Sequence, residues 1–256
     1  MIIKFITIIS YNSNIYINNN KEVFTCGVTK KTNGNEVAFV SKLSATGVKE
    51  WEKTLESSDG QNYTEFQKIE VDGDNIWVVG INKPNSTLLA AYNPDIILCK
   101  YVQASNGLSA TLGFQRAYAG ISGATRADNV TAIKKYSDTR FIIGGYTNTN
   151  SSSPYDAYIA SIDTAGSFSV KRKLASTSSS EKVTDIVIDG TDVYFSMETA
   201  ADTNASDINV AFGKATIGTS VITIEFIKEY IGPKKASGNH LPSSLWFSFI
   251  DKLFLW

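Results

Sequence analysis

The chain is poor in the residues that most often carry catalysis and metal binding. It has one histidine, His240, and two cysteines among 256 residues. A histidine-based catalytic triad, or a metal site with several histidines, therefore has at most one candidate residue. His240 lies in a Gly-Asn-His-Leu-Pro segment, where an exposed loop histidine is the simpler interpretation. We expect no metal and no cofactor.

A surplus of charge is also lacking. Lysines and arginines number 24, aspartates and glutamates 25, and the net charge is −1. Nucleic-acid-binding proteins usually carry excess positive charge to neutralise phosphates, so we set that class aside. No apolar run approaches the length of a transmembrane helix. The opening MIIKFITIIS is too short for the hydrophobic region of a signal peptide, and we interpret it as a strand.

The two cysteines, Cys26 and Cys99, fall on predicted strands of neighbouring repeats. A disulfide requires close Cα atoms, which this placement does not favour. We therefore expect buried free thiols, with a bridge as the alternative.

The chain contains instead an internal repeat of roughly 60 residues, a period typical of propellers and other radial arrays. One half of the repeat is a strand, a tight polar turn and a second strand. It occurs in FQKIEVDGDNIWVVG (66–80), VTAIKKYSDTRFIIGG (130–145), VTDIVIDGTDVYFS (183–196) and SSLWFSFIDKLFLW (243–256).

The other half opens with an acid, runs through alternating apolar residues and turns on a glycine. Its copies begin at Glu36, Asp95, Asp156 and Asp207. The turn glycines are Gly47, Gly107, Gly166 and Gly218. We expect positive φ at these glycines, as tight hairpins require.

The two halves alternate, so one unit is four strands, A to D, which is the content of a propeller blade. No segment shows a sustained helical period, and helix content should be close to nil. We predict an all-β fold and a single domain over 1–256. It is a β-propeller of four-stranded antiparallel blades, four complete plus a fifth built from both termini.

In that fifth blade, a D-like strand at residues 2–11 joins the hairpin at 245–256. An open ring would expose apolar strand edges, which favours closure. Deleting residues 1–10 should then abolish the monomeric fold. The alternative is that the chain is part of a larger propeller.

The segments DAYIASIDTAGSF (156–168) and FVSKLSATGVKEWEKTL (39–55) resemble the bacterial β-propeller repeats called SBBP repeats. Trp51 stands four residues after its glycine, and Thr111, Val170 and Ile222 hold that position in the other units. The resemblance implies a secreted or cell-surface bacterial protein with an adhesive or scaffolding role and no shared catalytic residues. The ATGVKEW segment is also similar to the tryptophan-docking repeat of quinoprotein dehydrogenases, whose calcium ligands we do not find here.

Candidate ligand-binding residues lie in the predicted B–C loops, which vary while the strands keep their pattern. These loops are 28–35, 81–94, 146–155 and 197–206. Tyr92, Tyr146 and Tyr155 could stack on sugars or peptides, with packing at the rim as the alternative. Most acids recur at turns and strand starts, but Glu198 and Asp202 break the repeat and, with His240, complete the candidate set.

These observations favour a non-catalytic extracellular binding or scaffold module, on a bacterial cell surface or a virion, that binds a glycan or a protein. The alternative is a secreted glycan hydrolase or lyase. It would require two or more convergent carboxylates or a Tyr–Glu pair on the loop face.

Overall fold

A computed structural model describes residues 10–31, 36–56, 63–83, 95–118, 128–148, 155–174, 179–201 and 208–230. In these residues the chain forms sixteen strands and no helix. Sheet 1 contains β1 (Ser10–Ile17), β2 (Val23–Lys30), β3 (Glu36–Leu43) and β4 (Lys49–Leu55). Sheet 2 contains β5 (Tyr63–Asp72), β6 (Asn75–Lys83), β7 (Asp95–Gln103) and β8 (Ala110–Tyr118). Sheet 3 contains β9 (Asp128–Ser137), β10 (Arg140–Asn148), β11 (Tyr155–Asp163) and β12 (Phe168–Lys173). Sheet 4 contains β13 (Ser179–Asp189), β14 (Asp192–Ala201), β15 (Ile208–Ile217) and β16 (Ile222–Tyr230).

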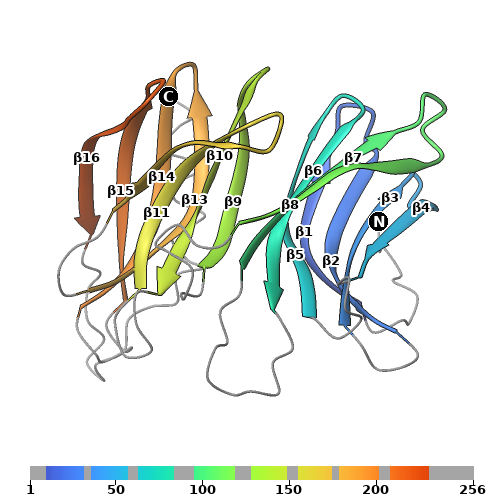
Figure 1. Ribbon diagram of the computed structural model, residues 1–256, viewed down its shortest axis with the longest axis horizontal. Helices are drawn as coiled ribbons and strands as arrows, with labels where there is room; N and C mark the ends of the chain where they lie inside the picture. Colours follow the sequence, from blue (N-terminus) through green and yellow to red (C-terminus); the bar gives the residue numbers. More distant parts are fainter. Residues whose placement is uncertain are drawn as a thin grey trace.

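Each sheet is an antiparallel meander whose four strands pair in chain order. The predicted all-β fold of four-stranded antiparallel units is therefore confirmed for four units. In every sheet, the turn between the first and second strands and the turn between the third and fourth strands lie at the same end of the strands, toward the top in Figure 1. We call this end of the stack the turn edge. The second strand of each sheet ends, and the third begins, at the opposite edge, which we call the far edge.

The turn glycines follow the prediction in three sheets. Gly47, Gly107 and Gly166 have φ of 83°, 71° and 82°, the left-handed region that glycine occupies without steric cost. Gly218 was predicted to be the same, and this is wrong. In sheet 4 the Gly218 N–H bonds to the Val221 carbonyl, which closes a shorter turn without left-handed backbone at Gly218.

The sheets stack face to face in chain order (Figure 1). Strand β5 packs against sheet 1, β9 against sheet 2, and β13 against sheet 3. The first strands β1, β5, β9 and β13 also contact one another in sequence, whereas contacts between successive fourth strands are few. The described strands of sheets 1 and 4 do not pack together, so these residues form an open stack rather than a closed ring.

Three apolar cores fill the three interfaces, because alternate residues of each strand face opposite neighbours. Phe24, Val40 and Trp51 of sheet 1 meet Phe66, Ile69, Val78 and Ile97 of sheet 2. Trp77, Val79, Ile96 and Leu98 of sheet 2 meet Ile133, Phe141, Ile143 and Tyr158 of sheet 3. Ile142, Ile159 and Val170 of sheet 3 meet Val183, Ile186, Phe195 and Ala211 of sheet 4.

Cys26 and Cys99 are buried free thiols in the first core, as predicted. Burial raises the pKa of both thiols well above the ordinary value, so neither is a reactive thiolate. The predicted D-like strand at 2–11 needs one correction. Ser10 and Tyr11 belong to β1, where they pair with Thr29 and Val28. The rest of that strand and the 245–256 hairpin lie outside the described residues.

Candidate functional site

Four side chains converge at the far edge, where sheet 3 meets sheet 4. Tyr146 lies near the end of β10 and Tyr155 at the start of β11. Lys182 lies on β13 and Glu198 on β14, where the two residues pair across the strands. We call these four residues the Tyr–Lys–Glu cluster.

The two tyrosines and the lysine form a compact unit. The ring centroids of Tyr146 and Tyr155 are 5.0 Å apart and the rings are inclined at 72°, an edge-to-face arrangement. The Lys182 Nζ lies 5.0 Å from the centroid of Tyr146 and 4.9 Å from that of Tyr155. One ammonium group therefore engages two aromatic rings, which orders a long side chain in a defined place.

The position of Tyr155 is fixed from sheet 4 as well. Its backbone N–H donates to the Ser180 Oγ across 3.2 Å, so β11 is tied to β13 beside the cluster. Burial raises the pKa of Tyr146, and the nearby Tyr155 and Glu198 raise it further. The Tyr146 hydroxyl therefore stays protonated at neutral pH and can donate a hydrogen bond.

The cluster lies where the repeat is broken. In sheets 1 to 3 the second strand carries a glycine opposite a bulge in the first strand: Gly27, Gly80 and Gly145. A Cβ on Gly80 would lie 1.8 Å from the Glu65 carbonyl oxygen, so these strands approach too closely for a side chain. Sheet 4 has Met197 at this position. The backbones of β13 and β14 must therefore be spaced differently there.

The residue after this position also departs from the repeat. Val28 and Ile81 occupy it in sheets 1 and 2, Tyr146 in sheet 3 and Glu198 in sheet 4. Tyr146 and Glu198 are thus the same repeat position in neighbouring sheets, with an aliphatic residue replaced first by a phenol and then by a carboxylate. Residues that break a structural repeat are candidates for function, since the fold does not require them.

The predicted site residues fall into two groups. Tyr146, Tyr155 and Glu198 come together in the structure, while Tyr92, Asp202 and His240 lie outside the described residues. The prediction that the first three lie in loops is wrong. All three belong to strands, because β10 and β14 extend into the predicted loops and β11 begins at Tyr155.

Sequence reasoning missed Lys182. Its signal was available, because Lys182 takes the repeat position that Tyr11, Glu65 and Asn129 fill in the other sheets. Recognising this equivalence requires the strand register, which the turn pattern alone leaves uncertain by a residue or two.

The cluster offers two aromatic faces, a phenolic donor, one ammonium and one carboxylate. Glycoside hydrolysis by the common mechanisms needs two carboxyl groups flanking the bond, and the cluster holds one. Within the described residues, no three His, Cys, Asp or Glu side chains are grouped so that they could hold a metal ion.

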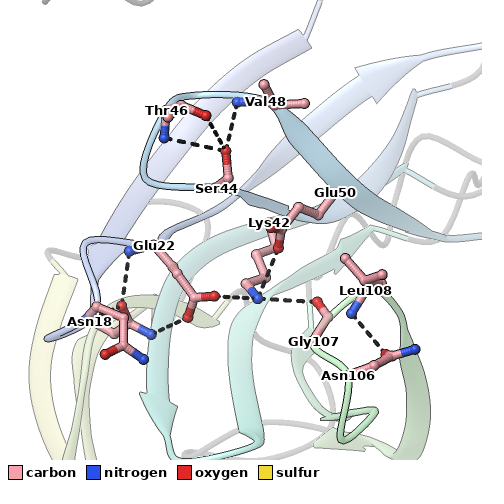
Figure 2. Close-up of polar contacts among 11 residues, drawn as sticks. Asn18, Glu22, Lys42, Ser44, Thr46, Val48, Glu50, Asn106, Gly107 and Leu108 are labelled. Atoms are coloured by element: carbon pink, nitrogen blue, oxygen red, sulfur yellow. Dashed lines mark hydrogen bonds and ion pairs between the residues drawn. The ribbon is translucent and has the colours of Figure 1, made fainter.

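A second charged cluster joins sheet 1 to sheet 2 at the turn edge (Figure 2). The Lys42 Nζ contacts Glu22 at 2.7 Å and Glu50 at 2.9 Å, and donates to the Gly107 carbonyl at 3.1 Å. The Lys42 side chain is 2% exposed, so all three partners lie around a buried cation. Glu22 is held in turn by the Asn18 side chain at 2.7 Å.

Burial lowers the pKa of Lys42, but its hydrogen bonds to Glu22 and Glu50 outweigh burial and leave the pKa raised. The bond from Lys42 lowers the pKa of Glu22, with a smaller contribution from Asn18. Lys42 therefore stays charged and fully partnered. We interpret this cluster as a structural clamp on the Gly107 turn.

Comparison with known proteins gives little to set beside this geometry. No family model matches the chain. No curated protein matches it either. A chain in a solved S. cerevisiae complex of a Dbp5 variant bound to Nup159, a Gle1 variant, IP6 and ADP shares 12% identity with it, with a TM-score of 0.34. The match covers 90% of this chain and 54% of that chain, so this chain spans about half of that one. A likeness of this degree carries no information on function.

A search of the described residues for a helix long and apolar enough to cross a membrane found none.

Proposed function

We propose that the chain is a non-catalytic binding or scaffold module whose far edge binds a glycan or a protein segment. The observation that supports this most strongly is the Tyr–Lys–Glu cluster. Its residues come from four strands of two sheets, and two of them replace the aliphatic residue of the repeat. Aromatic faces beside a charged group suit both sugar rings and peptide side chains.

The test is a glycan and peptide array probed with the purified chain and two variants. Tyr155→Ala removes one wall of the cluster, and Lys182→Ala removes its cation. Lys171→Ala is the matched control, because Lys171 also lies over an aromatic ring, 4.5 Å from the centroid of Phe168, outside the cluster. We expect captured ligands to be lost with both cluster variants and retained with the control. Capture that is equal in all variants would place the binding surface elsewhere.

The alternative is a secreted enzyme acting on glycans, as a hydrolase or lyase. The observation that favours it is the pairing of a phenol with an irregular carboxylate, Tyr146 with Glu198. Release of reducing sugar from any polysaccharide, abolished by Glu198→Gln or Asp202→Asn with unchanged thermal stability, would establish this alternative. Binding without release would support the binding module.

We also propose that the stack is closed into a propeller by a fifth blade built from both ends of the chain. The four stacked sheets support this, since each is a blade-like unit and the first strands lie together. Because Ser10 belongs to β1, the relevant deletion is residues 1–9. A deletion variant that stays monomeric with an unchanged melting temperature would refute the N-terminal contribution.

For location, we propose an extracellular or cell-surface site, bacterial or phage-associated. This proposal rests on the resemblance to SBBP repeats. Detection of the native protein only in the cytoplasmic fraction of its source would contradict it.

A further inference from the structure

Each sheet contacts the next through the same positions on its fourth strand. The position opposite the bulge partner is Trp51 in β4, Phe114 in β8, Val170 in β12 and Phe226 in β16. Phe114 and Phe226 are therefore the equivalents of Trp51. Counting four residues from the turn glycine had instead assigned Thr111 and Ile222 to this position, and the strand register corrects that assignment. The position four residues later is Leu55, Tyr118, Leu174 and Tyr230.

In the first three sheets these residues pack against the following sheet. Trp51 and Leu55 are buried in the core shared with sheet 2. Phe114 and Tyr118 pack against the core shared with sheet 3. Val170 and Leu174 are buried in the core shared with sheet 4. The two positions thus mark the face that receives the next blade.

Strand β8 shows how a Phe-x-Arg-x-Tyr sequence holds a following sheet. The turn glycine of sheet 3, Gly166, sits over Phe114 and Arg116, since a Cβ on it would meet their side chains at 2.9 and 3.0 Å. The Tyr118 hydroxyl donates to the Gly166 carbonyl, and the Tyr118 ring lies 4.4 Å from that of Phe168.

Strand β16 carries the same arrangement, but no following sheet among the described residues covers it; within sheet 4, the centroid of the Phe212 ring lies 5.6 Å from that of Tyr230. Phe226, Lys228 and Tyr230 occupy the positions of Phe, Arg and Tyr in β8, with the same bulge. The Lys228 Nζ lies 5.7 Å from the Phe226 ring centroid, as the Arg116 guanidinium lies 5.9 Å from that of Phe114. Yet Phe226 is 40% exposed and Tyr230 50% exposed. We call the surface formed by Phe226, Lys228 and Tyr230 the seat, because the equivalent surface of β8 carries the next sheet.

The opposite end of the stack shows the complementary half of the interface. An isoleucine recurs on the first strand of every sheet, where it pairs with the same repeat position of the second strand. These residues are Ile15, Ile69, Ile133 and Ile186. The last three are at most 4% exposed because the preceding sheet covers them, whereas Ile15 is 50% exposed.

The turn glycines show the same asymmetry. A side chain of the preceding sheet donates to the carbonyl of Gly107, Gly166 and Gly218, the donors being Lys42, Tyr118 and Arg140. No donor from the described part of the chain reaches Gly47, and the space around its Cα is open. Sheet 1 thus has an unfilled acceptor face and sheet 4 an unfilled seat.

We infer that one further blade, built from residues 231–256 together with residues 1–9, fills both faces at once. This rests on the proposed ring closure and identifies the surfaces that close it. Chain connectivity points to this occupant. Residues 231–256 directly follow Tyr230, which belongs to the seat. Residues 1–9 directly precede β1, which carries Ile15. After every other fourth strand, the next segment of chain packs on the sheet just completed.

Single cysteines provide the test, because both native thiols are buried and should not label in the folded chain. Ile15→Cys and Phe226→Cys report the two faces of the full chain. Val221→Cys is the control, since Val221 is 54% exposed on the sheet 4 turn, away from the seat. We expect both face cysteines to react with a maleimide at least about tenfold more slowly than the control. Their protection should not depend on protein concentration.

Deleting residues 243–256 should restore labelling at Phe226→Cys and leave Val221→Cys unchanged. If that deletion unfolds the chain, Cys26 and Cys99 will become reactive, and the full-chain comparison decides. Protection that grows with concentration, together with a dimer in light scattering, would assign the faces to a second copy and overturn the inference. Labelling at the control rate would show that both faces are open and overturn it as well. None of these results depends on ligand capture, so they do not affect the proposed binding role.

Discussion

At the residue scale, glycine has two separate roles in this chain. The turn glycines Gly47, Gly107 and Gly166 could be predicted because a tight hairpin needs left-handed backbone. Gly27, Gly80 and Gly145 could not, because their role depends on a bulge in the neighbouring strand. The Tyr–Lys–Glu cluster likewise has one part that could be predicted and one that could not. The sequence indicated the irregular Glu198, but the partnership of Lys182 with two tyrosines depends on strand register.

Gly80→Ala tests the close approach of β5 and β6. The added Cβ would lie 1.8 Å from the Glu65 carbonyl oxygen, so the backbone must move. We expect a loss of at least about 2 kcal/mol in the free energy of unfolding by urea. Gly113→Ala is the control, because its Cβ would lie 3.3 Å from the Lys100 carbonyl oxygen at an exposed bulge, and we expect less than about 1 kcal/mol. Equal losses would show that the close approach is not what requires glycine.

Lys42→Met tests the buried cation. The change keeps the length of the side chain but leaves Glu22, Glu50 and the Gly107 carbonyl without their shared donor. We expect a loss of about 1–3 kcal/mol in unfolding free energy. Lys49→Met removes an exposed partner of Glu52 and should change stability by less than about 0.5 kcal/mol. A Lys42 variant as stable as the wild type would show that the clamp contributes nothing.

At the scale of the elements, the alternation of apolar residues and the polar turns predicted the order and pairing of all sixteen described strands. The strand ends were predicted less well. Tyr146, Tyr155 and Glu198 were placed in loops because polar and aromatic residues follow the aliphatic runs, yet the ladders continue through them. Hydrogen bonding to neighbouring strands outweighs local composition there.

The ion pair between Lys42 and Glu22, part of the charged cluster that joins sheet 1 to sheet 2, should weaken in acid. The folded state lowers the pKa of Glu22 below its ordinary value of 4.5, so the contribution of this carboxylate is present above that value. It is lost as the pH falls through the lowered pKa. We therefore expect the stability difference between the wild type and Glu22→Gln, from urea unfolding, to be constant near neutral pH and to shrink below about pH 4.5. A difference that is independent of pH from 7 to 3 would contradict the ionic nature of the joint.

At the scale of the whole molecule, the described sheets form a stack in which one interface is repeated three times. Its two ends, at sheets 1 and 4, expose apolar side chains at positions of this interface. The repeat could be predicted from the sequence, but the exposure of these end residues could not, because it depends on which sheet covers which. Ile15 is 50% exposed and Phe226 40% exposed, and no neighbouring sheet among the described residues covers either side chain. The same stacking places strands of sheets 3 and 4 side by side at the far edge, where the Tyr–Lys–Glu cluster forms.

The most direct test of ligand binding at the Tyr–Lys–Glu cluster is a calorimetric titration of a ligand found on the array. It would compare the wild type with Tyr155→Ala, Lys182→Ala and the control Lys171→Ala. We predict affinity at least about tenfold weaker for each cluster variant, a loss of about 1.4 kcal/mol or more, and no more than about a twofold change for the control. Equal affinities in all four proteins, with every variant folded, would contradict the assignment of ligand binding to this cluster.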